Sequence, residues 1–168
     1  MVDLRLPTLL TLNDLETLYV LSKTNTKTVG LCHGCFDLTH WGHFLHFEQA
    51  KSMVDILIVS ITIDLLVTKS KGNERPYYNN SQRLIMLNSN SFIDHTYVCS
   101  QERSDQILKI LRPSYYFKGQ DYSDNSKHPG LIMEKEICKS LGTKVYYTTC
   151  DNYSTTNLVN KIKGNELL

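Results

Sequence analysis

Short apolar and β-branched runs alternate along this chain with longer segments whose apolar residues recur every three or four positions. The short runs are typical of strands buried on both faces, and the periodic segments are typical of helices packed by one face. Strands are expected at residues 28–31, 54–63, 92–98, 115–118 and 145–149. Helices are expected at residues 9–21, 40–50, 81–89, 104–111, 131–141 and 154–162.

Strands that alternate with helices in this way predict right-handed βαβ units. We therefore expect an α/β protein: a single Rossmann-like domain over residues 1–168, with a five-stranded parallel sheet flanked by helices. Residues 1–27 are expected to contribute a leading helix and a connection packed on that domain. Asn13 is the predicted N-cap of this helix, with Glu16 as its capping-box partner.

Length, charge and composition exclude several classes of protein. The 168 residues suffice for one domain with a substantial core. A net charge of +1 gives no field that favours nucleic acid or an anionic membrane. No apolar run approaches the roughly 20 residues of a spanning helix, and no secretion signal is evident. Five cysteines form no repeating framework and suit reduced thiols. These features predict a cytoplasmic protein that binds neither nucleic acid nor membrane.

The strongest chemical signal connects the first predicted strand to the next helix. It reads Cys32-His33-Gly34-Cys35-Phe36-Asp37-Leu38-Thr39-His40-Trp41-Gly42-His43. Such a junction lies at the carboxyl end of a parallel strand, where ligands bind, and it aims free backbone N–H groups at anions. The two histidines, three residues apart on the first helical turn, can project to the same side. The stretch predicts a phosphate-binding site.

This stretch resembles the GCFDxxHxGH signature of the HxGH-type α/β nucleotidyltransferases, which include cytidylyltransferases and several adenylyltransferases. Adenylyltransferase domains of the heptose-phosphate enzymes are similar along most of the chain. They share a K-G-x-x-R-P loop (residues 71–76), a KGxDY-like segment (118–122) and D-x-x-S-T-T-N (151–157). The resemblance implies transfer of AMP from ATP to a sugar phosphate of the heptose-1-phosphate type. Pyrophosphate would leave, and an ADP-sugar for surface polysaccharide would form.

Glycerol-3-phosphate cytidylyltransferases are also similar, and their motif carries tryptophan between the histidines, as Trp41 does here. Their R-T-x-G-I-S-T-T segment is only half matched, because Thr149 stands in place of the arginine. Transfer of CMP to make CDP-glycerol or a similar alcohol is therefore the alternative. The chain departs from the heptose type at His33, where asparagine is usual, and at Tyr153, where the glycine before S-T-T is missing.

The resemblance also implies roles for individual residues. The implied catalytic residues are His40, His43, Lys69 and Lys71. The implied nucleotide-binding residues are Gly34, Cys35, Phe36, Asp37, Gly42, Lys118, Gly119, Asp121, Ser154, Thr155 and Thr156. The implied acceptor-binding residues are His33, Asp64, Arg75 and Arg83. The two catalytic lysines lie in a predicted polar loop, residues 68–80, which is either a lid over phosphates or a plain solvated loop.

Substrates and partners follow from the same resemblance. We expect a nucleoside triphosphate, a phosphorylated sugar or polyol, and a homodimer. Mg²⁺ is expected to bridge the phosphates with few protein ligands. Asp37 and Asp121 are candidate contributors, but no residue is assigned as a metal ligand.

Three other readings compete with a transferase. Cys32 and Cys35 form a CxxC after a strand, which can serve thiol redox chemistry, although both precede the helix start. The same cysteines with His40, His43 and His46 could hold zinc, although His46 lies about 120° around the helix from His40. A non-catalytic nucleotide-binding module is the third, and release of pyrophosphate separates it from an enzyme.

Overall fold

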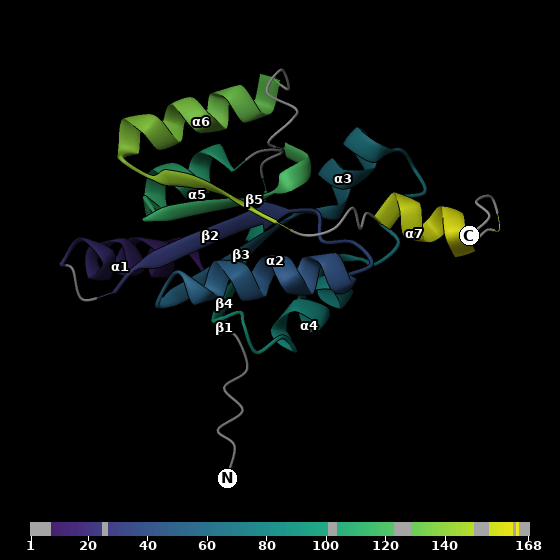
Figure 1. Cartoon of the computed structure of the whole chain (residues 1–168), viewed down its shortest axis with the longest axis horizontal. Coiled ribbons are helices and arrows are strands. Elements are labelled where there is room, and N and C mark those ends of the chain that lie inside the picture. The colour runs from purple at the N-terminus through teal and green to yellow at the C-terminus, as the bar shows by residue number, and fades with distance from the viewer. Residues whose placement is uncertain are drawn as a thin grey trace, which may run out of the picture.

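The computed structural model describes residues 8–24, 27–100, 104–122, 129–149, 155–162 and 164. Within them the chain forms one parallel sheet in the order β1-β4-β3-β2-β5-β6 (Figure 1). The strands are β1 (Thr8–Leu9), β2 (Val29–Gly34), β3 (Ile56–Thr62), β4 (His95–Cys99), β5 (Tyr115–Gly119) and β6 (Lys144–Thr148). The helices are α1 (Leu12–Lys23), α2 (Trp41–Ser52), α3 (Asp64–Lys71), α4 (Asn80–Asn88), α5 (Asp105–Leu111), the 3₁₀ helix η1 (Gln120–Tyr122), α6 (Pro129–Leu141) and α7 (Thr155–Ile162). The predicted α/β class and parallel sheet are confirmed.

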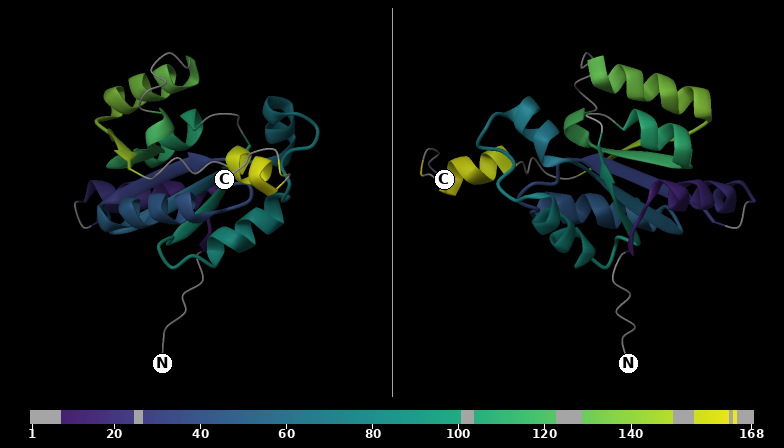
Figure 2. Two further views of the ribbon diagram at one scale, coloured as in Figure 1. Left: turned by 45° about the vertical axis from the view of Figure 1, so that its right-hand side comes forward. Right: turned by 180° about the vertical axis from the view of Figure 1, so that it is seen from behind.

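Helices cover both faces of the sheet, so the strands are buried on two sides. Successive strand residues point to opposite faces. Leu31 and Tyr116 therefore face a core shared with α1, α5 and α6, whereas Cys32 and Phe117 face a second core shared with α2 and α4. Figure 2 shows α5 and α6 on one side of the sheet and α2 and α4 on the other. The continuous apolar runs of β2 and β3 follow from this double burial.

The strand order creates a switch point between β2 and β5. The chain winds outward in one direction through β2, β3 and β4, then returns to the other side of β2 as β5 and β6. Strand β2 pairs with β3 along one edge and with β5 along the other, and Gly30, Leu31 and Cys32 take part in both pairings. Connections leave the carboxyl ends of β2 and β5 in opposite directions, which opens a crevice above them.

The amino-terminal segment differs from the expectation. Thr8–Leu9 forms β1, a short parallel strand beside β4, and the helix begins only at Leu12. Its N-cap is Thr11, not Asn13. The Thr11 N–H donates to the Asp14 carboxylate at 2.7 Å, and the Thr11 hydroxyl oxygen accepts from the Asp14 N–H. This reciprocal capping box satisfies two helix-end N–H donors, and it lies two residues earlier in the chain than the predicted pair.

The predicted polar loop over residues 68–80 is partly helical. Helix α3 runs from Asp64 to Lys71, and the loop begins at Gly72, whose φ of 96° ends the helix. Val67 is almost fully buried and anchors α3 to the domain. Burial of this apolar residue overrides the polar character of the Thr68–Lys71 stretch, and it places both lysines on a rigid element.

Candidate active site

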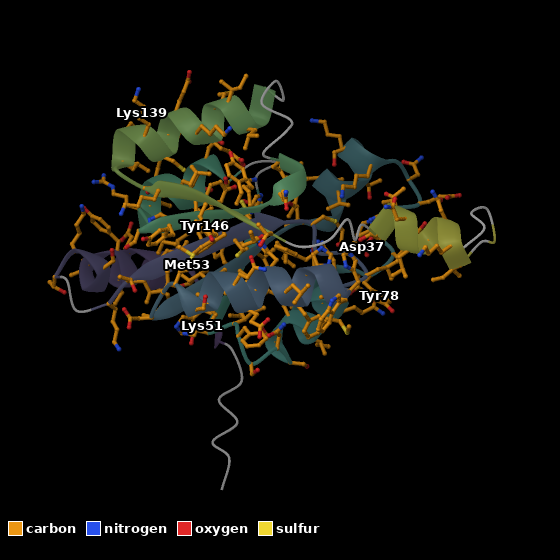
Figure 3. All side chains as sticks on the ribbon, viewed as in Figure 1. Asp37, Lys51, Met53, Tyr78, Lys139 and Tyr146 are labelled. Atoms are coloured by element: carbon orange, nitrogen blue, oxygen red, sulfur yellow. The ribbon has the colours of Figure 1, made fainter. Side chains whose placement is uncertain are left out.

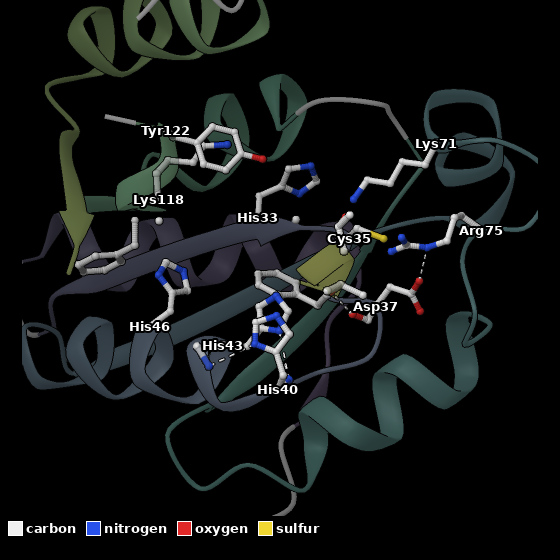
Figure 4. Close-up of a pocket in the computed structure, with 17 residues that line it drawn as sticks. His33, Cys35, Asp37, His40, His43, His46, Lys71, Arg75, Lys118 and Tyr122 are labelled. Carbon is white, nitrogen blue, oxygen red and sulfur yellow. Dashed lines mark hydrogen bonds and ion pairs between the residues drawn. The ribbon is translucent and has the colours of Figure 1, made fainter. Parts of the chain in front are cut away.

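A cavity of about 560 Å³ lies over the carboxyl ends of β2 and β5 (Figure 4). It occupies the switch point of the sheet, where the strand-to-helix connections diverge. Fourteen of the nineteen residues assigned from the sequence line it: His33, Gly34, Cys35, Phe36, Asp37, His40, Gly42, His43, Lys71, Arg75, Lys118, Gly119, Thr155 and Thr156. Residues from the two halves of the chain therefore meet at one place.

The histidine pair sits at the start of α2 with both rings fixed. His40 is the N-cap, and its Nδ1 accepts a hydrogen bond from the Gly42 N–H at 3.2 Å. Nδ1 of His43 accepts from the His40 N–H at 3.3 Å, and the two ring centroids are 4.0 Å apart. Because each Nδ1 is an acceptor, a neutral ring carries its proton on Nε2. Both histidines thus have an Nε2–H donor available for a ligand.

Burial keeps these rings neutral. It lowers the pKa of His43 to about 3, with further lowering from nearby His40, His46 and Lys71. Burial also lowers the pKa of His40. A proton added to either ring would in addition break the backbone hydrogen bond at Nδ1. The pair is therefore suited to donate hydrogen bonds at neutral pH, not to exchange protons.

The connection before the histidines is held in an unusual backbone conformation. Phe36 and Leu38 have φ values of 48° and 47°, in the left-handed region that bulky side chains rarely adopt. The buried Phe36 ring packs on Phe47 at 5.1 Å and edge-on to His43 at 5.4 Å between centroids. A Cβ on Gly34 would meet the Phe36 ring at 3.3 Å. Packing of this ring thus determines the path of the connection.

Asp37 fastens a second loop to the site. Its Oδ2 accepts from Arg75 Nε at 2.8 Å and from the Tyr77 N–H at 2.9 Å, and its Oδ1 accepts from the Tyr78 N–H at 3.0 Å. Burial by itself would raise the pKa of Asp37, but these hydrogen bonds outweigh it and lower the pKa. The carboxylate is therefore a clasp on the loop that carries Arg75. The same backbone connects to α7, because the Thr155 hydroxyl donates to the Asp37 carbonyl oxygen at 3.0 Å.

The two lysines of α3 have different surroundings. Lys71 lines the cavity, whereas Lys69 does not. Residues two apart on a helix lie about 200° apart and do not face the same side. The resemblance implied that both lysines contact the phosphates, but the fold places only Lys71 of the two at the cavity. The cationic end of the cavity consists of Lys71 and Arg75, as Figure 4 shows.

Asp64 and Arg83 do not line the cavity either. Arg83 is fully buried, and its Nη2 donates to the Thr62 carbonyl at 2.7 Å, to Asp64 at 2.8 Å and to Asn80 at 2.8 Å. Its Nη1 donates to the Cys35 carbonyl. The guanidinium joins the end of β3 and the starts of α3 and α4 to the connection after β2. Arg83 therefore supports the floor of the site and has no surface available for an acceptor, whereas Asp64 is partly exposed but lies outside the cavity lining.

The remaining implied residues lie at the end of β5 and beyond. Lys118 lines the cavity, pairs with Glu134 of α6 at 2.8 Å and lies 5.0 Å from the Tyr122 ring centroid. Nδ1 of His33 is 3.1 Å from the Ser60 hydroxyl, and burial lowers the His33 pKa to about 4. The side chain of Asp121 and all of Ser154 lie outside the described residues.

Three residues of the cavity lining were not expected: His46, Phe117 and Tyr122. His46 follows His43 by three residues on α2, and that spacing was a signal for a third side chain on the same side of the helix. Phe117 and Tyr122 flank the Lys118-Gly119 pair in the sequence. Only the position of β5 beside β2 shows that they reach the histidines' cavity.

The competing thiol and zinc readings find little support in this geometry. Cys32 lies fully buried in the core facing α2, and burial raises the pKa of its thiol, which disfavours the reactive thiolate. Across the part of the chain that the structure describes, no three His, Cys, Asp or Glu side chains are placed to hold a metal ion together. In the same residues, no helix is long and apolar enough to cross a membrane.

Comparisons with known proteins agree with this site. The model of a family described as cytidylyltransferase-like matches residues 31–161. The bifunctional protein HldE of Geotalea uraniireducens is 31% identical over 153 residues, which are 90% of this chain and 30% of that protein. The HldE protein of Campylobacter fetus is 33% identical over 138 residues, 82% of this chain and 28% of that protein. This chain thus spans less than a third of the length of these relatives.

Solved structures support the fold. A lipopolysaccharide core biosynthesis protein from Thermoplasma volcanium matches with a TM-score of 0.61 at 19% identity, over 76% of this chain and 99% of that one. A pantoate-beta-alanine ligase from Francisella tularensis matches with a TM-score of 0.59 at 15% identity, over 96% of this chain and 78% of that one. At these identities the likeness concerns the arrangement of strands and helices.

Proposed function

Because the chain belongs to the cytidylyltransferase-like family, we propose that it is a nucleotidyltransferase that moves AMP from ATP to a sugar phosphate of the heptose-1-phosphate type. The products are pyrophosphate and an ADP-sugar. The observation that carries this proposal is the pair of neutral Nε2–H donors, His40 and His43, at the start of α2 beside the cations Lys71 and Arg75.

The reaction needs positioning and charge stabilisation more than proton transfer. An oxygen of the acceptor phosphate attacks the α-phosphorus of the triphosphate, and the bond from that phosphorus to the β-phosphate oxygen breaks. The attacking oxygen is already ionised, so no general base is required. His40 and His43 donate from Nε2 to the α-phosphate oxygens, where negative charge accumulates in the transition state. Fixed rings lose no orientational freedom when this charge develops.

The other groups of the cavity bind the phosphates that flank the reacting centre. Lys71 and Arg75 neutralise the leaving pyrophosphate or the acceptor phosphate, since both are cations at one end of the cavity. The hydroxyl of Thr156 and backbone N–H groups at the start of α7 bind further phosphate oxygens. Thr155 instead anchors this helix start to Asp37 through its hydroxyl.

Magnesium enters this proposal as part of the substrate. The Asp37 carboxylate already accepts three hydrogen bonds, one of them from Arg75, and so fits a structural role better than that of a metal ligand. Mg²⁺ keeps most of its water and binds phosphate oxygens readily, where it neutralises charge. We therefore expect it to arrive on the triphosphate.

ATP is preferred over CTP in this proposal for two reasons. The Lys118–Tyr122 segment and the D-x-x-S-T-T-N stretch (residues 151–157) are similar to those of the heptose-phosphate adenylyltransferases. From these two segments, the cavity lining includes Lys118, Gly119, Tyr122, Thr155 and Thr156. Relatives that match most of this chain include several HldE proteins. Cytidylyl transfer to a polyol phosphate stays the second candidate, because Trp41 stands between the histidines.

Release of pyrophosphate tests the proposal. The chain is incubated with Mg²⁺ and each of ATP, CTP, GTP and UTP, against heptose-1-phosphate and glycerol-3-phosphate. We expect the highest kcat/KM with ATP and heptose-1-phosphate. A clear preference for CTP would overturn the assignment of ATP as the nucleotide. If no pair of nucleotide and acceptor released pyrophosphate, the proposal that the chain is a nucleotidyltransferase would be overturned.

Two alanine variants test the histidines within the same assay. His43→Ala is expected to lower kcat on the order of a hundredfold with a small change in KM, as for a lost transition-state donor. His95→Ala is the matched control, because His95 is a half-buried histidine on β4 outside the cavity. Normal kcat with a raised KM in His43→Ala would mean that His43 only binds the ground state.

The proposal has two further parts. The enzyme is expected to act in the cytoplasm, where nucleoside triphosphates are made, and to form a homodimer. Leu158 and Ile162 leave apolar surface exposed on α7, which a second copy would cover. Light scattering on the purified chain measures the mass directly, and a monomer at micromolar concentration would contradict the dimer.

A further inference from the structure

The cavity has a second end, opposite the cations, with a different character. Figure 4 shows His46, Lys118 and Tyr122 on one side of the histidine pair and Lys71 and Arg75 on the other. Phe117 and Gly119, the neighbours of Lys118 in β5, also line the cavity. Lys118 is already paired with Glu134. Aromatic rings therefore make up much of this second end, and its lysine is already paired.

This chemistry fits a nucleobase better than a sugar. A base has two apolar faces and one polar edge, and aromatic side chains bind such faces well. A sugar has hydroxyl groups around its whole ring, and each of them would need a polar partner on burial. At this end, His46 is the polar side chain best placed to meet a polar edge. It is 7% exposed, three residues and about 4.5 Å along the helix axis beyond His43.

The hydrogen bonds of His46 determine which of its nitrogens carries the proton. Nδ1 is 2.6 Å from the Thr148 hydroxyl oxygen, and this hydroxyl donates to the Lys118 carbonyl at 3.3 Å. A hydroxyl has one proton to donate. Both bonds form only if Nδ1–H of His46 donates to Thr148, and then Nε2 has a free lone pair. His46 is thus an acceptor at Nε2, opposite in sense to His40 and His43.

We propose that Nε2 of His46 accepts a hydrogen bond from the exocyclic amine of the nucleobase, with Thr148 as the positioning residue. The site then selects bases with an amine at this edge, adenine or cytosine, over the oxo bases hypoxanthine and uracil. An oxo group would instead place its oxygen lone pair against the lone pair of His46 Nε2, and no hydrogen bond would form. Burial lowers the pKa of His46 to about 4, so the ring is neutral and this acceptor is present near pH 7.

The inference rests on the proposed function, and it deepens that function by naming how the base is read. It holds for ATP and CTP alike, because both carry the amine. His46 can respond to an oxo base by moving its proton to Nε2, at the cost of the Thr148 bond to Lys118. The expected discrimination is therefore modest, about tenfold, in line with one hydrogen bond.

The test compares ATP with inosine triphosphate, which differs from ATP by an oxo group in place of the amine. The measured quantity is the ratio of kcat/KM values with one acceptor, together with the ratio of dissociation constants from calorimetry. The wild type is expected to favour ATP about tenfold in both. His46→Gln, whose amide can donate or accept, should bring both ratios near one. Thr148→Val should do the same with His46 intact, because it removes the bias on the proton.

Thr143→Val is the matched control. Thr143 is also buried and donates its hydroxyl to a backbone carbonyl, that of Pro113 at 2.7 Å, but it lies at the other end of β6. Its ratio should match the wild type. If both His46→Gln and Thr148→Val keep the wild-type ratios, or if their KM for the acceptor rises instead, the inference is overturned and the sugar occupies this end. If the chain transfers no nucleotide, the proposed function fails, and the calorimetric ratios still decide the base contact.

Discussion

Replacement of Asp37 by asparagine probes the clasp between the two loops of the site. The substitution keeps the size of a side chain that is almost fully buried, but it removes the charge. The wild-type carboxylate accepts from Arg75 Nε and from the N–H groups of Tyr77 and Tyr78, at 2.8 to 3.0 Å. An amide offers one oxygen, and its NH₂ group would face at least one of these donors. One or two of the three hydrogen bonds are therefore lost.

The size of the effect follows from the partners. A hydrogen bond to a charged group contributes about 1.5–3 kcal/mol, and removal of one member of a buried ion pair costs about 3–5 kcal/mol. The Arg75 side chain is 14% exposed, so water repays part of the loss. We expect the free energy of unfolding of Asp37→Asn to fall by about 3 kcal/mol at pH 7. For a domain of this length, that lowers Tm by about 6–12 °C.

Urea unfolding at two pH values checks this reasoning. The pKa of Asp37 is lowered by folding, so its contribution is complete above about pH 5 and is lost as pH falls through the lowered pKa. The difference between wild type and variant should therefore shrink at about pH 3. Asp55→Asn is the control, because Asp55 makes similar bonds to the Thr28 N–H and hydroxyl at 2.7 and 2.6 Å on the exposed surface. Equal stability of Asp37→Asn and wild type at pH 7, or a difference independent of pH, would refute the clasp.

Three further outcomes are expected. Lys71→Ala should raise KM for the triphosphate about tenfold or more, whereas Lys69→Ala should change it little; equal effects in steady-state kinetics would place both lysines at the phosphates. Because the pKa of His43 is lowered to about 3, kcat/KM should show no histidine ionisation between pH 6 and 8, and a step near pH 6.5 that disappears in His43→Asn would contradict the neutral donor. Folding lowers the pKa values of His33, His43 and His46 to about 4, 3 and 4, so the unfolded chain binds more protons below pH 6.5. Stability should then fall by several kcal/mol between pH 6.5 and 4.5, steeply in wild type and less so in His46→Leu, as thermal unfolding would measure.

The sequence by itself determined the class of the fold and the position of the site. Apolar runs and helical spacing are local properties, and they predict strands and helices without knowledge of their partners. The junction from His33 to His43 can also be recognised from local sequence. A strand that leads into a helix through glycines presents the backbone N–H groups of the helix start at the edge of the sheet. The short pairing of β1 with β4 was not readable in this way, because its two residues show no period.

Only the tertiary structure decided which side chains meet at the site and in what role. Asp37 and Arg75 are 38 residues apart, His46 and Thr148 are 102 apart, and Asp37 and Thr155 are 118 apart. The Asp37–Arg75 contact depends on the placement of β3 beside β2, and the other two depend on the placement of β5 and β6 on the other side of β2. No local pattern encodes either placement. The role of Arg83 was also decided by the tertiary structure. The sequence suggested a cation that binds a ligand, but in the fold its guanidinium donates to backbone carbonyls and to Asp64. A side chain's chemistry is local, but the hydrogen bonds that assign its role come from distant parts of the chain.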